Sequence, residues 1–295
     1  MTVSEMIVDL ARVQGVQHIF GLPNGGALMD IMEAGRQRGV KLVHVAHEST
    51  APIAAGAYGQ LKGASGLALA IRGPGAGNLA GGAAVCHFER LPVVCLCDTV
   101  RADRPMAQVC DQARLFDGVV KDQVTLTADQ ATRAVQQAFA LTRDGHPGPV
   151  LVNLPTDVSG RTCADPAPPA PSSPRRAPSS PDTEAARELI ACFDAPVIIA
   201  GSDVLRDGAQ DELLALADTL DAAVLAAMDA RGVIAEDHPR FAGVFAGLAS
   251  PNVLASRILA QADGVIVAGM DALMTEAPWQ SELPVCELSA RPDCT

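Results

Sequence analysis

The stretch LVHVAHESTAPIAAGAYG, residues 42–59, decides how the first part of this chain folds. It begins as a short β-branched apolar run, passes through the polar pair His47 and Glu48, and continues mainly in small residues. A strand that is apolar throughout is typical of a parallel sheet that is buried on both faces. The carboxylate then falls where such a strand ends and a helix begins.

The same alternation continues along residues 1–160. Helical patterns separate short apolar runs, and this order predicts a parallel sheet that is covered by helices on both faces. The expected strands are 18–22, 42–46, 67–71, 93–97 and 150–154, and the expected helices are 3–14, 27–38, 51–62, 76–86 and 128–143. Ligands of such folds bind outside the carboxyl ends of the strands, and Glu48 falls at such an end.

Residues 161–182 are rich in Pro, Ser and Ala and have no apolar periodicity, so they predict an extended linker. It would join an N-terminal domain, 1–160, to a smaller domain, 183–295. The second domain repeats the alternation, with expected strands at 196–201, 222–227, 264–269 and 284–288 and helices at 213–220 and 254–260. The expected fold class is α/β, with two parallel-sheet domains of three layers each.

Composition excludes several classes of function. The chain has 295 residues and a net charge of −12, which disfavours a nucleic acid partner. It shows neither a signal-peptide pattern nor an apolar run of about 18 residues, so we expect a cytoplasmic protein without membrane contact. The eight cysteines lack any zinc-binding spacing, and we expect them to be reduced and mostly buried, with no metal ligands in this chain.

Two glycine-rich stretches, FGLPNGG at 20–26 and RGPGAGN at 72–78, each follow an expected strand and precede an expected helix. Such loops offer backbone N–H groups and allow close approach to a ligand. The first stretch is a poor match to the nicotinamide type of turn, because Pro23 sits where flexibility is needed and no acidic residue is clearly placed about 20 residues on.

Taken in order, the motifs of this chain resemble those of the thiamine diphosphate-dependent enzymes of the acetohydroxyacid synthase type. The stretches similar to that family's pyrimidine-binding domain are FGLPNGG at 20–26, HE at 47–48, GPGAGN at 73–78, HFERLPVVCL at 87–96 and GPVLVNLPTDV at 148–158. Those similar to its central domain are RGVIAEDHP at 231–239 and ADGVIVAGMD at 262–271. The resemblance covers nearly the whole chain.

The resemblance implies a catalytic role for Glu48. A thiamine cofactor becomes a nucleophile when the thiazolium C2 proton leaves, and the base is the cofactor's own 4′-amino group in its imino form. A carboxyl group that is hydrogen-bonded to the pyrimidine N1′ favours this tautomer, and a glutamate in a low-dielectric cleft suits that task. The small residues after Glu48 would let a helix pack close behind the cofactor ring.

The other site residues are also assigned by resemblance. The expected cofactor-binding residues are Pro23, Asn24, Gly25, Glu48, Gly73, Pro74 and Asn78. The expected substrate pocket is lined by Gly26, Arg72, Asp98 and Gln108. Two alternatives stay open at this stage, since His47 could be a structural residue and Asn78 a local cap.

The chain departs from the family pattern in ways that affect the pocket. Family members commonly have Gly at the position of Asn24, a Gly-Gln pair where this chain has Asp98 and Thr99, and Ser or Thr where it has Arg72. An acid at 98 and a base at 72 change the polarity of the pocket, so pyruvate should not be assumed as the substrate. FAD is not expected, because the family's flavin-binding residues are not recognisable in 183–295.

Family enzymes also carry a third domain, whose G-D-G…N motif holds Mg²⁺ and the diphosphate, and that motif does not occur in these 295 residues. The resemblance therefore predicts one subunit of a split, acetolactate synthase-like lyase or transferase, with thiamine diphosphate and Mg²⁺ held mainly by a separate partner chain. The expected reaction is 2-oxo acid decarboxylation, acyl-carbanion ligation or both, in a heterotetramer that contains a homodimer of this chain. A non-catalytic stabilising or regulatory subunit and a piece of a longer enzyme remain alternatives.

Overall fold

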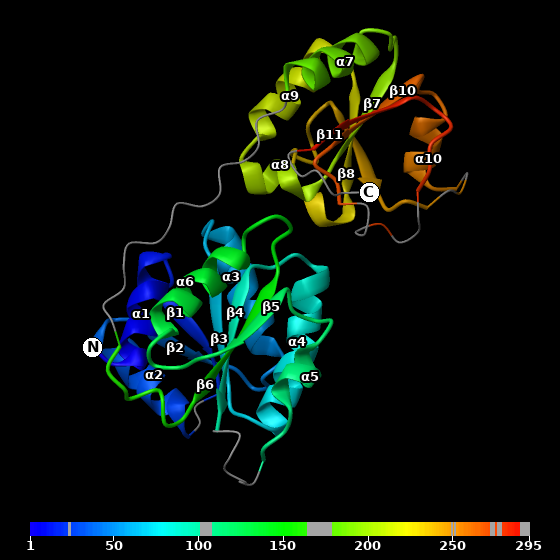
Figure 1. The fold of residues 1–295 in the computed structure, drawn as a ribbon. Coiled ribbons are helices and arrows are strands. Elements are labelled where there is room, and N and C mark those ends of the chain that lie inside the picture. Colours follow the sequence, from blue (N-terminus) through cyan, green and yellow to red (C-terminus); the bar gives the residue numbers. More distant parts are fainter. Residues whose placement is uncertain are drawn as a thin grey trace. The chain divides into compact units, whose positions relative to one another are not determined.

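The computed structural model describes residues 1–22, 25–100, 108–163, 179–248, 250, 252–271, 275 and 279–289. The chain divides into two compact units, Met1–Ser173 and Pro174–Thr295 (Figure 1). Within the described ranges, no helix combines the length and the apolar character that crossing a bilayer requires.

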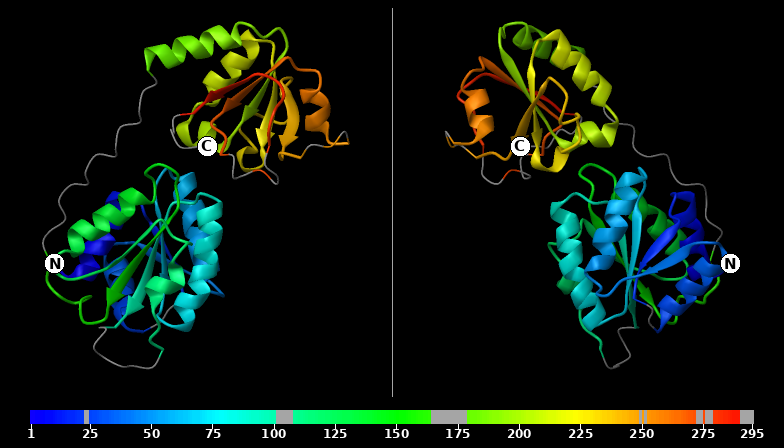
Figure 2. Two further views of the ribbon diagram at one scale, coloured as in Figure 1. Left: turned by 45° about the vertical axis from the view of Figure 1, so that its right-hand side comes forward. Right: turned by 180° about the vertical axis from the view of Figure 1, so that it is seen from behind.

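The first unit contains a parallel sheet with helices on both faces (Figure 2). Its six described strands lie in the order β2-β1-β3-β4-β6-β5, and every neighbouring pair is parallel. The strands are β1 (His18–Gly21), β2 (Lys41–His44), β3 (Gly66–Ala70), β4 (Val93–Thr99), β5 (Asp122–Thr125) and β6 (Pro149–Pro155). The helices are α1 (Val3–Val13), α2 (Ala27–Gln37), α3 (Thr50–Leu61), α4 (Pro74–Phe88), α5 (Gln112–Phe116) and α6 (Ala131–Leu141).

Two apolar layers enclose this sheet. Leu67 and Leu69 of β3 belong to a cluster that includes residues of α1, α2 and α6, whereas Ala68 and Ala70 belong to one that includes residues of α3 and α4. Successive side chains of a strand point to opposite faces, so β3 is buried on both sides. This double burial explains why the strand is apolar at every position, and it confirms the expected fold class.

Glycines bring α3 and α4 into close contact with their neighbours. A Cβ atom at Gly66 of β3 would lie 2.0 Å from the carbonyl oxygen of Ala55 in α3. A Cβ atom at Gly82 of α4 would lie 2.1 Å from the carbonyl oxygen of Ser49, just before α3. Neither distance accommodates a carbon atom, so this packing requires glycine at both positions. Glycine at these two positions thus lets α3 approach β3 and α4 closely.

The second unit is a smaller parallel sheet with its own apolar core (Figure 1). Its five described strands lie in the order β11-β10-β7-β8-β9, again with parallel neighbours throughout. The strands are β7 (Pro196–Ala200), β8 (Ala223–Ala227), β9 (Phe241–Phe245), β10 (Gly264–Ala268) and β11 (Val285–Leu288). The helices are α7 (Ser180–Ile190), α8 (Ser202–Asp207), α9 (Gln210–Thr219) and α10 (Leu254–Leu259), with a short 3₁₀ turn, η1 (Met228–Ala230).

The predicted bounds of the linker, 161–182, were wrong at both ends. Thr162 forms an antiparallel bridge with Thr2, which ties the start of the segment to the N-terminus. At the other end α7 begins at Ser180, and the Ser179 hydroxyl accepts a hydrogen bond of 3.3 Å from the backbone N–H of Asp182. A serine in a Ser-rich segment can cap a helix, and composition alone does not distinguish such a cap from linker. Residues 164–178 lie outside the described part.

Candidate active site

The candidate site lies at the carboxyl edge of the first sheet. Glu48 lies in the turn between β2 and α3, Arg72 and Gly73 follow β3, and Asp98 is near the end of β4. Strands that run in parallel end at the same edge, so residues far apart in sequence meet there. Three segments of the first unit therefore contribute to one site.

Glu48 is a buried carboxylate that contacts the beginning of α4. Its side chain comes from the turn after β2, and the residue is only 8% exposed. Asn78 donates a hydrogen bond of 2.9 Å from Nδ2 to Oε2 of Glu48. The other oxygen, Oε1, would lie 3.3 Å from a Cβ atom at Gly75, so Gly75 packs closely beside the carboxylate. Asn78 is therefore a donor to Glu48 and does not cap α4, whose N-cap is Gly73, and its contact with a cofactor stays a prediction.

Gly73 and Gln108 are in direct contact. Gly73 caps the N-terminus of α4 with φ of 69°, and Pro74 occupies the first turn, where proline is favourable. A Cβ atom at Gly73 would lie 2.4 Å from the carbonyl oxygen of Gln108, which itself has φ of 68°. The backbone of Gln108 thus packs against the start of α4, so the predicted site residues Gly73 and Gln108 lie side by side.

Asp98 is completely buried, at 0% exposure, and its carboxylate serves three donors. Arg72 forms an ion pair with Oδ2 through Nη1, while the backbone N–H of Ala27 and the hydroxyl of Thr156 donate to Oδ1 at 3.2 and 3.1 Å. The predicted place of Asp98 in the substrate pocket stays a prediction, and in the structure its carboxylate is fully occupied by the protein. It fastens the loop after β3 to the N-terminus of α2 and to the end of β6.

Arg72 is the less deeply buried member of this ion pair. Its side chain is 14% exposed, and its Nε atom is buried with no hydrogen-bond partner among the described residues. Buried polar groups in proteins nearly always have partners, so this donor requires an explanation.

The first glycine-rich loop packs on the same carboxylate. Gly26 has φ of 67°, and a Cβ atom there would lie 2.7 Å from Oδ2 of Asp98. Gly26 thus lies next to the Arg72–Asp98 pair. Gly25 has no atom within 4 Å of a Cβ position and so borders open space. Pro23 and Asn24, two predicted cofactor contacts, lie outside the described residues.

His47 makes a local contact. The Ser49 hydroxyl lies 2.6 Å from its Nδ1 atom, and His47 is exposed. This arrangement is the structural alternative that the sequence left open. No three His, Cys, Asp or Glu side chains of the described ranges gather in a way that could hold a metal ion. The expectation that this chain lacks metal ligands remains a prediction.

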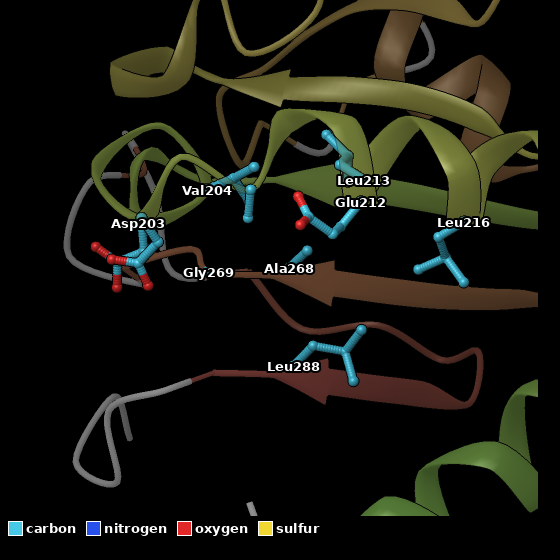
Figure 3. Close-up of a pocket in the computed structure, with 10 residues that line it drawn as sticks. Asp203, Val204, Glu212, Leu213, Leu216, Ala268, Gly269 and Leu288 are labelled. Atoms are coloured by element: carbon cyan, nitrogen blue, oxygen red, sulfur yellow. The ribbon is translucent and has the colours of Figure 1, made fainter. Parts of the chain in front are cut away.

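The second unit contains a separate pocket of about 220 Å³, which sequence reasoning missed (Figure 3). Figure 3 shows Leu213 and Leu216 of α9 on one side and Leu288 of β11 on the other. Asp203, Asp207 and Glu212 also line it, and Arg206 pairs with Asp203 at 2.9 Å. Carboxylates around a pocket repel the negatively charged diphosphate of a nucleotide cofactor. The expectation that FAD does not bind nevertheless remains a prediction.

Comparison with known proteins gives two family matches and a set of relatives. Residues 1–115 match the N-terminal TPP binding domain of thiamine pyrophosphate enzymes, and residues 183–285 match their central domain. The chain is 32% identical over 256 residues to the probable acetolactate synthase large subunit of Methanococcus aeolicus, covering 83% of this chain and 42% of that protein. It is 30% identical over 286 residues to the catabolic acetolactate synthase of Raoultella terrigena, covering 94% and 50% respectively.

A solved structure supports the fold. The thiamine diphosphate-dependent 4-hydroxybenzoylformate decarboxylase of Rhodococcus jostii RHA1 superposes with a TM-score of 0.83 at 23% identity, and the match covers 100% of this chain and 57% of that one. The chain spans half or less of the length of these curated relatives.

Proposed function

Because this chain belongs to the thiamine pyrophosphate enzymes, whose N-terminal and central domains match its two parts, we propose that it forms the pyrimidine side of a thiamine diphosphate site. The observation that carries the proposal is the buried carboxylate of Glu48. Asn78 donates to one of its oxygens, and Gly75 packs closely beside the other.

These residues fit the cofactor that the family implies. Thiamine diphosphate, when bound, supplies the nucleophilic carbon for breaking or forming bonds next to a carbonyl group. Glu48 would bind the pyrimidine N1′ and stabilise its protonated form from within a low-dielectric environment. Asn78 would keep the carboxylate in one orientation, and glycine at 75 avoids a Cβ atom that would lie 3.3 Å from Oε1 of Glu48 and 2.8 Å from Cγ2 of Ile71. These are tasks of positioning and of proton binding.

The proposed reaction is the decarboxylation of a 2-oxo acid, the ligation of the resulting acyl group to an acceptor, or both. The printed names of the relatives, acetolactate synthases, support this class. We further propose that a partner chain supplies the G-D-G…N motif that would bind the diphosphate and Mg²⁺. The proposed assembly is a cytoplasmic heterotetramer in which two copies of this chain meet two partners.

Calorimetry tests the proposal. The purified chain is titrated with thiamine diphosphate and Mg²⁺, first alone and then with a candidate partner that carries the G-D-G…N motif. We expect weak or no binding by the chain alone, because most charge-assisted contacts would come from the partner. Binding and 2-oxo acid turnover should appear with the partner, and Glu48→Gln should abolish most of the turnover.

Two other outcomes would contradict parts of the proposal. Micromolar, Mg²⁺-dependent binding together with turnover by this chain alone would rule out the split arrangement. A stable complex with the partner that shows no turnover on any 2-oxo acid would favour the non-catalytic alternative.

A further inference from the structure

The guanidinium of Arg72 is only partly used by the protein. Its Nη1 atom binds Asp98, whereas its Nε atom is buried and has no hydrogen-bond acceptor among the described residues. A buried donor that is left without an acceptor carries the full desolvation penalty of that group, which is larger when the group is charged. The arrangement is therefore favourable only if another acceptor reaches Arg72.

The unused part of the guanidinium has a defined shape. The Nε and Nη2 hydrogens of arginine point in the same direction and form an edge that binds a carboxylate through two parallel hydrogen bonds. Asp98 occupies Nη1, which is not on that edge. Asp98 is itself held by Ala27 and Thr156, so the head of Arg72 is fixed in place. One bidentate edge remains for a further anion.

Arg72 is part of the segment that also contacts Glu48. Gly73 follows it directly and caps α4, and Gly75 lies beside the Glu48 carboxylate. The N-terminus of α4 adds positive potential to the same place. An anion that binds Arg72 would thus sit on the loop and helix start that also border the proposed cofactor site.

We propose that Arg72 binds a substrate carboxylate that is retained through the reaction, an inference that rests on the proposed function. The carboxylate of a donor 2-oxo acid leaves as CO₂ and loses its charge in the transition state. An arginine paired with that group would stabilise the bound substrate more than the transition state, and would slow the reaction. A retained carboxylate carries no such penalty. It is either the far carboxylate of a dicarboxylic donor or the carboxylate of a 2-oxo acid acceptor.

The first test observes Arg72 directly and requires neither cofactor nor turnover. The Nε–H resonance of Arg72 is recorded by ¹H–¹⁵N NMR of the full chain and assigned by its disappearance in Arg72→Lys. The chain is titrated with 2-oxoglutarate, with pyruvate and with sodium chloride at matched ionic strength. We expect a saturable shift with at least one of the two oxo acids and none with chloride. A response to both oxo acids no larger than the response to chloride overturns the inference.

The second test separates the two sources of the carboxylate in the reconstituted enzyme. Wild type and Arg72→Lys are compared with 2-oxoglutarate as donor, and with pyruvate as both donor and acceptor. The arm that uses Arg72 should lose about 10- to 100-fold in kcat/KM, mainly through KM, since a buried polar group loses its partner. A larger loss with 2-oxoglutarate identifies the far carboxylate of a donor, and a larger loss with pyruvate identifies the carboxylate of an acceptor. Equal losses in the two arms, or no loss in either, overturn the inference.

Folding and the proposed function are controlled separately. Arg72→Lys keeps a cation beside Asp98, and the double variant Arg72→Gln/Asp98→Asn replaces the ion pair by a neutral one. The double variant should lose the same arm as Arg72→Lys while the chain remains folded by circular dichroism. If the wild type turns over no 2-oxo acid, the proposed function fails, and the NMR titration still decides whether Arg72 binds a carboxylate.

Discussion

Asn78 of α4 donates a hydrogen bond of 2.9 Å to Glu48, which comes from the turn before α3. Two elements that are separate in sequence therefore fix one carboxylate. The position of Asn78 on its helix is set by the start of α4 at Pro74, capped by Gly73. The orientation of the proposed catalytic acid consequently depends on where that helix begins.

Glu48→Gln should preserve the fold and reduce the turnover of the reconstituted enzyme by about 10²-fold or more. Glutamine has nearly the same size but cannot act as a carboxylate toward the cofactor ring. Steady-state turnover and thermal unfolding measure the two effects separately. Glu89→Gln, at an exposed position just after α4, is the matched control and should behave as wild type. Normal turnover by Glu48→Gln would remove Glu48 from the mechanism.

Asn78→Ala should reduce turnover by about 10-fold, because Glu48 loses the donor that orients it. Asn78→Asp should reduce turnover further, since it places a second carboxylate within hydrogen-bonding distance of the first, where like charges repel. Both variants are measured in the reconstituted enzyme at saturating cofactor. Equal turnover by Asn78→Asp and wild type would show that this contact does not position Glu48.

Gly82→Ala should destabilise the first unit by about 1–3 kcal/mol or more, because its Cβ atom would collide with the carbonyl oxygen of Ser49. Gly81→Ala on the same helix is the matched control. That position is exposed and has no atom within 4 Å of a Cβ, so alanine should stabilise by about 0.5–1 kcal/mol. Urea unfolding followed by the fluorescence of Tyr58, the only tyrosine, reports on this unit. Equal stabilities for the two variants would contradict the packing described above.

Asp98→Asn should destabilise the first unit by about 3–5 kcal/mol, because it leaves the Arg72 charge without its buried partner. The double variant Arg72→Gln/Asp98→Asn should recover part of this loss, since the two changes remove one interaction. Urea unfolding of wild type, Asp98→Asn, Arg72→Gln and the double variant gives the coupling free energy. Strict additivity of the two single changes would show that the ion pair does not contribute to the fold.

Cys86 should make stability fall at alkaline pH. Burial raises the pKa of this thiol to about 12 from the model-compound value of 9.0. The unfolded chain loses this proton above about pH 9 while the folded chain keeps it, so the contribution of Cys86 is complete below pH 9 and is lost between pH 9 and 12. The difference in unfolding free energy between wild type and Cys86→Ala should therefore shrink by about 1.4 kcal/mol per pH unit in that window.

The control for this prediction is Cys192→Ala, because Cys192 is exposed. Its difference from wild type should vary much less between pH 8 and pH 11 than that of Cys86→Ala. A gap between wild type and Cys86→Ala that stays constant with pH would mean that the thiol titrates normally in the folded chain.

The central strands were predictable from the sequence because they are buried on both faces. β3, β4, β7 and β10 are apolar almost throughout, and their predicted and observed bounds agree to within two residues. β5 was missed because it is a half-exposed edge strand with the sequence DQVT. β9 was missed because it is only partly buried and contains Gly243, whose φ of 121° is unusual for a strand.

The site was only partly predictable for a related reason. The motif spacing suggested that Glu48 and Asn78 belong to one site, and the hydrogen bond between them is seen in the structure. The surroundings of Asp98 depend instead on which face of β4 it occupies. Cys97 packs in the layer of α3 and α4, so strand alternation turns Asp98 to the other face, toward α2. A family motif aligned by sequence does not reveal such a difference between faces.

The contact between Gly82 and Ser49 also limits which substitutions such a chain can accept during evolution. Ser49 adjoins Glu48, so a larger residue at 82 would displace the backbone that carries the acid. A lineage that abandoned the reaction would be free to replace Glu48, yet it would still need Gly82 to pack its two helices. Descendants with glycine at 82 and another residue at 48 would therefore be those that kept the scaffold after giving up the chemistry.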